Sequence, residues 1–419
     1  MTAFDLSVRF FLQAAVVLAA CRIVGAVFAR LGQSQVVSEM IAGVLLGPSL
    51  LGWAAPAVSA YLFPPDSRAI LYTVSQLGLV LYMFLIGAEF DISLIRTRAR
   101  SATAISVAGI AGPFALGGGL GVLLAGNADL FPPGESAIEA AIFLGAALSI
   151  TAFPMLARII LEQGLTKTSL GTLALTAGSI NDALAWGALA IAIASYQRDP
   201  QIAVLAVGGG VAFGLFATLA LPRLLAPLGN RVAREGGIDA PTLVLVLTVV
   251  MLGAWCTDAI HIYAVFGAFL VGIAMPRGRF QEELRRILYP MTTSLLLPFF
   301  FVYSGLNTRI GVVNTWGLWG IAIAVLAAAI LGKGVACYAA ARWHGESHRE
   351  ALAIGTLMNA RGLMELIIVN IGLQNHMIEP SLFAILVMMA IVTTLIATPI
   401  FQRIYGPPPP AGATRSFAE

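Results

Sequence analysis

The chain has 419 residues, of which 59% are hydrophobic and only 11% are charged, and its formal net charge at pH 7 is +3. This balance excludes a soluble globular protein and is typical of a polytopic helical membrane protein. The basic residues lie in short connections, so they indicate membrane topology and exclude a nucleic-acid-binding patch.

Apolar segments of spanning length follow one another along the whole chain. Because a helix needs about 20 residues to cross the hydrocarbon core, the sequence predicts about thirteen membrane helices. In chain order they cover about 6–29, 34–52, 69–88, 101–125, 137–161, 168–195, 202–221, 240–257, 260–275, 287–305, 314–341, 350–373 and 381–404. The first begins with Asp5 and Arg9 and lacks a small-residue cleavage site, so we expect a retained span and no signal peptide.

Charged residues near the segment ends indicate the orientation of the chain. When the N-terminus is placed outside, 17 lysines and arginines fall on one side of the membrane and 4 on the other. By the positive-inside rule, this bias predicts an odd number of spans, an outside N-terminus and a cytoplasmic C-terminus. Glu39, Glu89 and Asp91 also lie near segment ends, and we interpret them as interfacial charges or residues of an entry funnel.

Two of the apolar segments carry polar or helix-breaking residues at their centres. The interrupting residues are Ser149, Thr151 and Pro154 in segment 137–161, and Asn359, Arg361 and Gly362 in segment 350–373. The two segments stand seven apart, and this odd offset makes them antiparallel in the membrane. Interrupted helices at corresponding places in two inverted halves point to the midplane site of a secondary transporter. Unwound backbone at that depth is tolerated only where it lines a cavity or is buried in protein.

Four charged residues lie deep in predicted spans, namely Asp182, which follows Asn181, and Lys333, Arg361 and Glu365. An ionised side chain at the bilayer centre costs about 3 kcal/mol or more, so such residues face a protein interior or an ion pathway. Singly they have structural explanations, since Arg361 and Glu365, at i,i+4 spacing, would form an ion pair. Their joint occurrence with the two interruptions predicts a transport site.

The corresponding interruptions divide the chain into two inverted repeats. The expected ranges are 1–405 for one transmembrane domain, about 6–195 for repeat one, about 202–221 for a linker helix and about 240–404 for repeat two. Segments 101–195 and 314–404 would form a core bundle, and the remaining segments would form a scaffold. The proline-rich end, 406–419, is expected to be a disordered cytoplasmic tail.

Five stretches of the sequence carry a family resemblance. They are VVSEMIAGVLLGPSLLG (36–52), GLVLYMFLIGAEFD (78–91), SITAFPMLARII (149–160), AGSINDALAW (177–186) and NARGLMELIIVNIG (359–372). In this order they resemble the sodium/hydrogen-exchanger membrane domain of the monovalent cation:proton antiporter 2 family. That family includes bacterial Kef-type potassium/proton antiporters and the plant cation/H⁺ exchangers, and the resemblance spans nearly the whole chain.

The resemblance implies thirteen helices with crossing, discontinuous helices five and twelve, usually in a homodimer formed through the scaffold. It places the ion-binding acid at Asp182, the variable position before it at Asn181, the crossover threonine at Thr151 and the basic residue of helix eleven at Lys333. The expected location is the plasma (inner) membrane of a bacterium. Kef-type proteins generally carry a nucleotide-binding regulatory domain, and since no GxGxxG motif follows a strand, we expect no such domain in this chain.

Together, the residues and the resemblance predict a secondary antiporter in which H⁺ and a monovalent cation compete for Asp182. Hard cations prefer oxygen ligands, and the expected ligands are Asp182, Asn181, Thr151 and Ser149 with nearby carbonyls. Because Asn181 cannot titrate, one acid implies one proton per cation, which is electroneutral exchange. K⁺ is favoured over Na⁺ from the resemblance alone, and no cofactor is expected besides the transported ions.

Lys333 and Arg361 are expected to offset the carbonyl ends of the half-helices or to hold the empty carboxylate. In the main alternative, Lys333 carries a second proton and the protein is an electrogenic Na⁺/H⁺ antiporter. A cation channel is disfavoured because no TVGYG-like filter occurs, and an organic-ion transporter using Arg361 is disfavoured because Asp182 repels anions. An enzyme is not expected, since no second catalytic acid, HExxH or Ser/His grouping accompanies Asp182.

Overall fold

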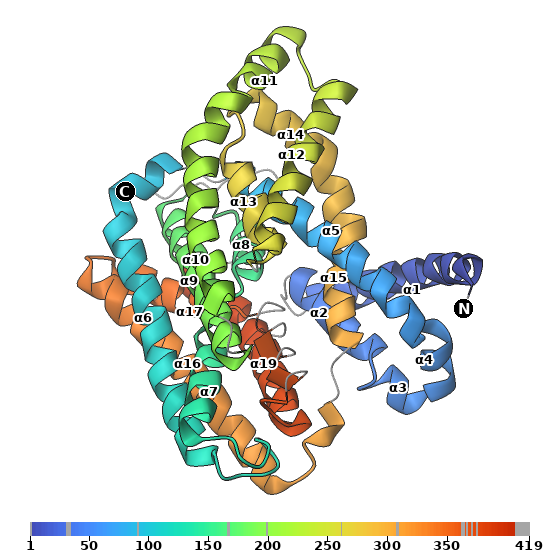
Figure 1. Ribbon diagram of the computed structural model, residues 1–419, viewed down its shortest axis with the longest axis vertical. Helices are drawn as coiled ribbons and strands as arrows, with labels where there is room; N and C mark the ends of the chain where they lie inside the picture. The colour runs from blue at the N-terminus through green and yellow to red at the C-terminus, as the bar shows by residue number, and fades with distance from the viewer. Residues whose placement is uncertain are drawn as a thin grey trace. The chain divides into compact units, whose positions relative to one another are not determined.

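The computed structural model describes residues 2–30, 35–89, 92–165, 168–197, 200–260, 262–306, 310–361, 365, 368–369, 372–373 and 376–406. Helices account for nearly all of this described part, which contains no strand (Figure 1). The predicted all-helical membrane fold is therefore confirmed. Gly362 and residues 407–419, which make up nearly all of the predicted tail, lie outside the described residues.

The chain divides into two compact units. Unit one consists of Met1–Leu18, Phe63–Ile92 and Trp186–Tyr303, and unit two consists of Ala19–Leu62, Ser93–Ala185 and Ser304–Glu419. Unit one contains α5 (Pro65–Glu89), α10 (Pro200–Leu215), α11 (Leu221–Glu235), α12 (Ala240–Ala259), α13 (Ala264–Ile273), α14 (Arg279–Met291) and most of α15 (Leu297–Leu306). Unit two contains α2 (Gln35–Leu46), α3 (Leu51–Ala54), α4 (Pro56–Leu62), α6 (Ile92–Leu124), α7 (Ala137–Ser149), α8 (Phe153–Glu162), α16 (Trp316–Trp343), α17 (His348–Met358) and α19 (Pro380–Tyr405). The long helices α1 (Ala3–Ala29) and α9 (Ser169–Gln197) contribute to both units.

Each predicted membrane segment contains a helix. Within the described ranges, nine stretches are long and apolar enough to cross a membrane, and α7 and α13 are shorter apolar helices. Three predictions were clearly too short, because α6 already begins at Ile92, one helix continues through α11 to Glu235 and another already begins at Arg279. The added turns carry arginines and glutamates, which favour a helix but not lipid, so a search for apolar segments ends before the helix does.

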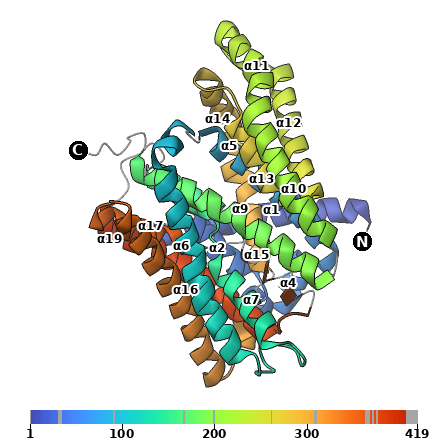
Figure 2. The same cartoon turned by 60° about the vertical axis from the view of Figure 1, so that its left-hand side comes forward.

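Glycines bring α16 into backbone contact with two neighbours in unit two. A Cβ on Gly112 of α6 would lie 2.5 Å from the carbonyl oxygen of Gly332, and one on Gly355 of α17 would lie 2.6 Å from that of Gly334. Both views show α6 beside α16 (Figures 1 and 2). Since Lys333 lies between the two glycines of α16, this close packing fixes the position of its backbone.

The helices α7 and α17 begin with the same N-terminal cap. Before α7, Ser136 Oγ accepts the N–H of Glu139 while the Glu139 carboxylate accepts the N–H of Ser136. Ser347 and Glu350 form the same capping box before α17. Each box satisfies N–H groups that a helix start leaves unpaired. The shared signature marks corresponding helices and supports the interpretation of two repeats.

Candidate ion-binding site

The first predicted interruption is present between α7 and α8. α7 ends at Ser149, the next residues through Ala152 have extended backbone angles or no regular structure, and α8 begins at Phe153 with Pro154 in its first turn. Proline suits the first turn because its missing N–H would have no intrahelical partner there. The break therefore leaves Thr151 in unwound backbone within an otherwise apolar span.

The second predicted interruption is present at the end of α17. This helix ends at Met358, Asn359 is its C-terminal cap, and Arg361 lies beyond the helix. The break is confirmed at Asn359 and Arg361, whereas Gly362 lies outside the described residues.

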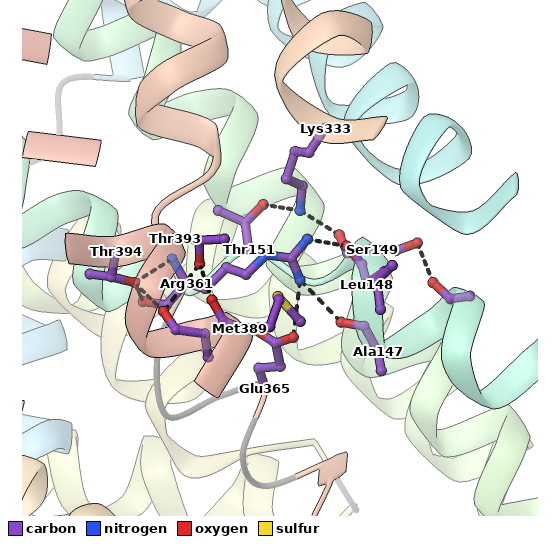
Figure 3. A network of polar contacts seen from close by, with 12 residues as sticks. Ala147, Leu148, Ser149, Thr151, Lys333, Arg361, Glu365, Met389, Thr393 and Thr394 are labelled. Atoms are coloured by element: carbon purple, nitrogen blue, oxygen red, sulfur yellow. Dashed lines mark hydrogen bonds and ion pairs between the residues drawn. The ribbon is translucent and has the colours of Figure 1, made fainter. Parts of the chain in front are cut away.

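Arg361 joins the two breaks. Its guanidinium donates to the carbonyl oxygen of Ala147 at 3.3 Å and to that of Leu148, both in the last turn of α7 (Figure 3). It also forms an ion pair with Glu365 at 3.0 Å, and both side chains are at most 1% exposed. The last carbonyls of a helix have no intrahelical partner and carry partial negative charge, so a cation is stabilising there. The pairing of Arg361 with Glu365, considered from their spacing, is confirmed.

Lys333 reaches the same helix end from α16. Its Nζ donates to the carbonyl oxygen of Ser149 and to Thr151 Oγ1, each at 2.6 Å, and the side chain is fully buried (Figure 3). Thr151 was expected to bind a transported cation. In this structure the Lys333 side chain is hydrogen-bonded to the Thr151 hydroxyl and to the neighbouring carbonyl of Ser149.

α9 brings Asn181 and Asp182 to the same break. Asn181 Oδ1 accepts the backbone N–H of Thr151 at 3.2 Å, and Asp182 is only 4% exposed. Asp182 also interacts electrostatically with Lys333. The structure therefore gathers Asp182, Asn181, Thr151 and Lys333 in one buried region of unit two.

Thr394 of α19 is a part of the site that sequence analysis missed. Its Oγ1 accepts the backbone N–H of Arg361 at 3.0 Å and lies 2.6 Å from the carbonyl oxygen of the same residue (Figure 3). Asn181 holds Thr151 of the first break in the same way. The signal was present, since two adjacent threonines, Thr393 and Thr394, interrupt an apolar span, but hydropathy does not distinguish a functional hydroxyl from a tolerated one.

The last residues before each break are also held by corresponding contacts. Ser149 Oγ donates to the carbonyl oxygen of Ile110 in α6 at 3.0 Å, and Asn359 Nδ2 donates to that of Ile330 in α16 at 3.4 Å. Ser149 lies two residues before Thr151, and Asn359 lies two residues before Arg361, so the two residues occupy corresponding positions at the two breaks. Corresponding hydrogen bonds therefore hold both breaks, which supports an inverted repeat.

Thr394→Val is expected to lower the free energy of unfolding by about 1–3 kcal/mol, because the buried N–H of Arg361 loses its acceptor. Thr393→Val is the matched control, since within the described part of the chain Thr393 Oγ1 bonds only to carbonyls of its own helix, and its loss should cost below about 1 kcal/mol. Thermal unfolding of the purified variants measures both effects. Equal stability of the two variants would show that Thr394 does not hold the second break.

Comparison with known proteins places this geometry in a family. The family model described as sodium/hydrogen exchanger, transmembrane, matches residues 15–405. The chain is 39% identical over 395 residues to the Na⁺/H⁺ antiporter NhaS4 of Synechocystis sp., covering 94% of this chain and 96% of that protein. It is 36% identical over 399 residues to cation/H⁺ antiporter 18 of Arabidopsis thaliana and 31% identical over 404 residues to K⁺/H⁺ antiporter 1 of Saccharomyces cerevisiae. Each of these two matches covers 94% of this chain but only 49% and 46% of the relative, so the chain spans about half the length of the plant and yeast proteins.

A solved structure shows the same fold. The sodium proton antiporter MjNhaP1 of Methanocaldococcus jannaschii superposes with a TM-score of 0.57 at 12% sequence identity, over 95% of this chain and 98% of that one. The likeness to the plant exchangers seen in the five sequence stretches is confirmed by the Arabidopsis relative. Because the family model covers most of the chain and full-length similarity exceeds 30% identity, the protein is an integral membrane protein that belongs to the sodium/hydrogen exchanger transmembrane family.

Proposed function

We propose that the protein is a secondary antiporter that exchanges a monovalent cation for H⁺ across a membrane, with K⁺ favoured and Na⁺ as the alternative. The observation that carries this proposal is the burial of Asp182 beside an unwound break, to which its neighbour Asn181 is hydrogen-bonded. The names of the relatives, which are antiporters of Na⁺, K⁺ or other cations against H⁺, support the same activity.

Competition for Asp182 couples the two fluxes. A carboxylate inside the membrane needs a positive partner when it is ionised, because an unpaired buried charge is costly. Asp182 would carry a proton in one transit and a dehydrated cation in the other, and the core would move only with this group neutralised. Asn181 cannot titrate, so a single acid gives one proton per cation and electroneutral exchange.

Lys333 has a specific place in this cycle. The cation needs oxygen ligands, and Thr151 Oγ1 and the carbonyl of Ser149 are already bound to the Lys333 ammonium. A cation can use these oxygens only when Lys333 withdraws from them. The lysine would thus fill the site between transits and limit the time for which Asp182 is ionised without a partner.

Lys333→Met is expected to lower the KM for the cation and to lower the maximal exchange rate about tenfold. The KM falls because the competing ammonium is gone, and the rate falls because the carbonyl end of α7 loses a positive charge. Exchange rates in proteoliposomes over a range of cation concentrations measure both effects. Lys167→Met, which removes the other lysine of the chain, is the control. A raised KM in Lys333→Met would contradict the competition.

The proposal extends to the organisation of the protein in the membrane. We infer a core formed by 101–195 and 314–404 that moves against a scaffold, with an outside N-terminus, in the plasma membrane of a bacterium and as a homodimer. Unit two contains both breaks together with Asp182, Asn181, Thr151 and Lys333, which supports the assignment of a core. The proposed partners are monovalent cations, protons and the lipid bilayer; no nucleotide-binding domain, cofactor or enzymatic activity is part of the proposal.

Transport by the purified protein in proteoliposomes tests the proposed function. Na⁺, K⁺, Li⁺ and Rb⁺ are added separately to vesicles that contain a pH dye, with and without an ionophore that clamps the voltage. Electroneutral exchange predicts dye responses that saturate with cation and do not change when the voltage is clamped. A response driven by voltage would support the alternative in which Lys333 carries a second proton, and conduction without H⁺ counterflow would contradict antiport.

A further inference from the structure

A buried acid lies in α2, outside the region around Asp182. Glu39 is 2% exposed, and its Oε1 accepts a hydrogen bond from Gln35 Nε2 at 3.0 Å. Its other oxygen, Oε2, is buried and has no hydrogen-bond donor in the part of the chain that the structure describes. Burying a carboxylate oxygen without a partner is costly, so this oxygen can take a proton or a cation.

α8 brings a charged pair to Glu39. α2 packs against α8 within unit two, and Arg158 and Glu162 of α8 both interact electrostatically with Glu39. Arg158 Nε and Glu162 Oε1 form an ion pair at 2.8 Å. The same guanidinium therefore interacts with two carboxylates, those of Glu162 and Glu39. The Cys21 thiol of α1 also interacts with Glu39.

The charges of this cluster do not cancel. α3, which also packs on α2, has no titratable residue, and Arg403 and Tyr405 in the last turn of α19 are not among the described groups that interact electrostatically with Glu39. Two carboxylates and one guanidinium leave one uncompensated negative charge when both acids are ionised. Such a charge is costly at the buried Glu39 carboxylate, so the cluster is suited to one additional positive charge.

α8 links this cluster to the candidate ion-binding site. Its first residue, Phe153, follows the break that contains Thr151, and its last residue is Glu162. Ten helical residues span about 15 Å, so the cluster and the break lie at opposite ends of one short helix. In the proposed topology, the Glu162 end of α8 is the cytoplasmic end.

We propose that Glu39 and the Arg158–Glu162 pair form a second cation site, at which a monovalent cation replaces a proton before the cation reaches Asp182. This inference rests on the proposed function. The proton leaves the Glu39 carboxyl group as the cation arrives, so the net charge of the cluster is unchanged and no buried charge is left unpaired. The site would raise the local concentration of cations at the cytoplasmic end of the pathway.

Proton release from the purified protein tests the second site without transport. K⁺ is added to protein in lightly buffered detergent solution with a pH dye, and Na⁺ is used in a parallel series. Two independent sites predict that Asp182→Asn and Glu39→Gln each retain roughly half of the wild-type release, and that the double variant retains none. Asp129→Asn, which removes an exposed carboxylate, is the control and should release as much as the wild type.

The outcomes separate this proposal from the proposed function. Full release from Glu39→Gln, or none from Asp182→Asn, would overturn the second site, whereas full release from Asp182→Asn would contradict the role of Asp182. Glu162→Gln is an independent variant, because Arg158 then pairs with Glu39 alone and the excess negative charge disappears. It should lose the same half of the release, and retention of that half would also overturn the proposal. Thermal unfolding checks that each variant is folded.

Discussion

Asp182→Asn is expected to reduce cation-dependent H⁺ movement to the background of empty vesicles while the protein remains folded. The amide has nearly the same shape as the carboxylate, but it neither accepts a transported proton nor balances the charge of a cation. Asp182 is buried, and its neighbour Asn181, which is hydrogen-bonded to Thr151, is an amide that cannot titrate in its place. Dye quenching in proteoliposomes measures the loss for each cation.

The control for this variant is Asp129→Asn, which removes an exposed carboxylate and should exchange at the wild-type rate. Equal thermal stability of wild type and Asp182→Asn would show that the loss is not caused by unfolding. Coupled K⁺ or Na⁺ flux in Asp182→Asn would mean that the exchanged ions bind elsewhere, and the proposed function would lose its central group.

Arg361→Gln is expected to destabilise the protein by about 3–5 kcal/mol, the largest stability effect we predict. The guanidinium bonds to two carbonyls at the end of α7 and to Glu365, and all of these contacts are buried. Its removal leaves the Glu365 carboxylate unpaired and the carbonyl end of α7 without its cation. Thermal unfolding in detergent measures the loss, and the amount of folded protein recovered should fall with it.

Arg231→Gln is the matched control for this prediction. Arg231 and Glu235 are also four residues apart with a nitrogen–oxygen distance of 3.0 Å, but both side chains are at least 45% exposed. Exposed pairs contribute about 0–1 kcal/mol, so this variant should unfold almost as the wild type does. The double variant Arg361→Met/Glu365→Leu leaves no unpaired charge and should recover part of the stability. Equal losses of stability in Arg361→Gln and Arg231→Gln would show that the contacts of Arg361 do not hold the two breaks together.

The positions of the two breaks could be predicted because their cause is local. Pro154 lacks an N–H, and polar residues such as Thr151 and Asn359 mark unwound backbone, which is tolerated at the centre of a span only where it is buried in protein or lines a cavity. The spans could also be predicted, from hydropathy, because their cause is local as well. Each segment in lipid must form its backbone hydrogen bonds within itself, and a helix does so. Where the helix leaves lipid, as in α11 and α14, this constraint no longer applies and the predicted ends were wrong.

The partners of the buried side chains could not be predicted in the same way. Whether Lys333 binds Asp182 or the end of α7 depends on the rotation and depth of α16 against α7, which no local pattern encodes. The contact of Thr394 with Arg361 depends likewise on the packing of α19 against the second break. The sequence indicated the polar residues at the two breaks but not Thr394, and the hydrogen bonds of all of them depend on how helices distant in the chain pack together.

The glycines on either side of Lys333 determine how this residue can move. Because Gly332 and Gly334 place the α16 backbone directly on α6 and α17, neither rotation nor sliding of α16 can occur without separating three helices. Withdrawal of the ammonium from Thr151 must therefore come from torsions of the four-carbon lysine side chain alone. Vacating the site would therefore require the movement of one buried side chain and the breaking of its two hydrogen bonds, with α16 itself staying in place.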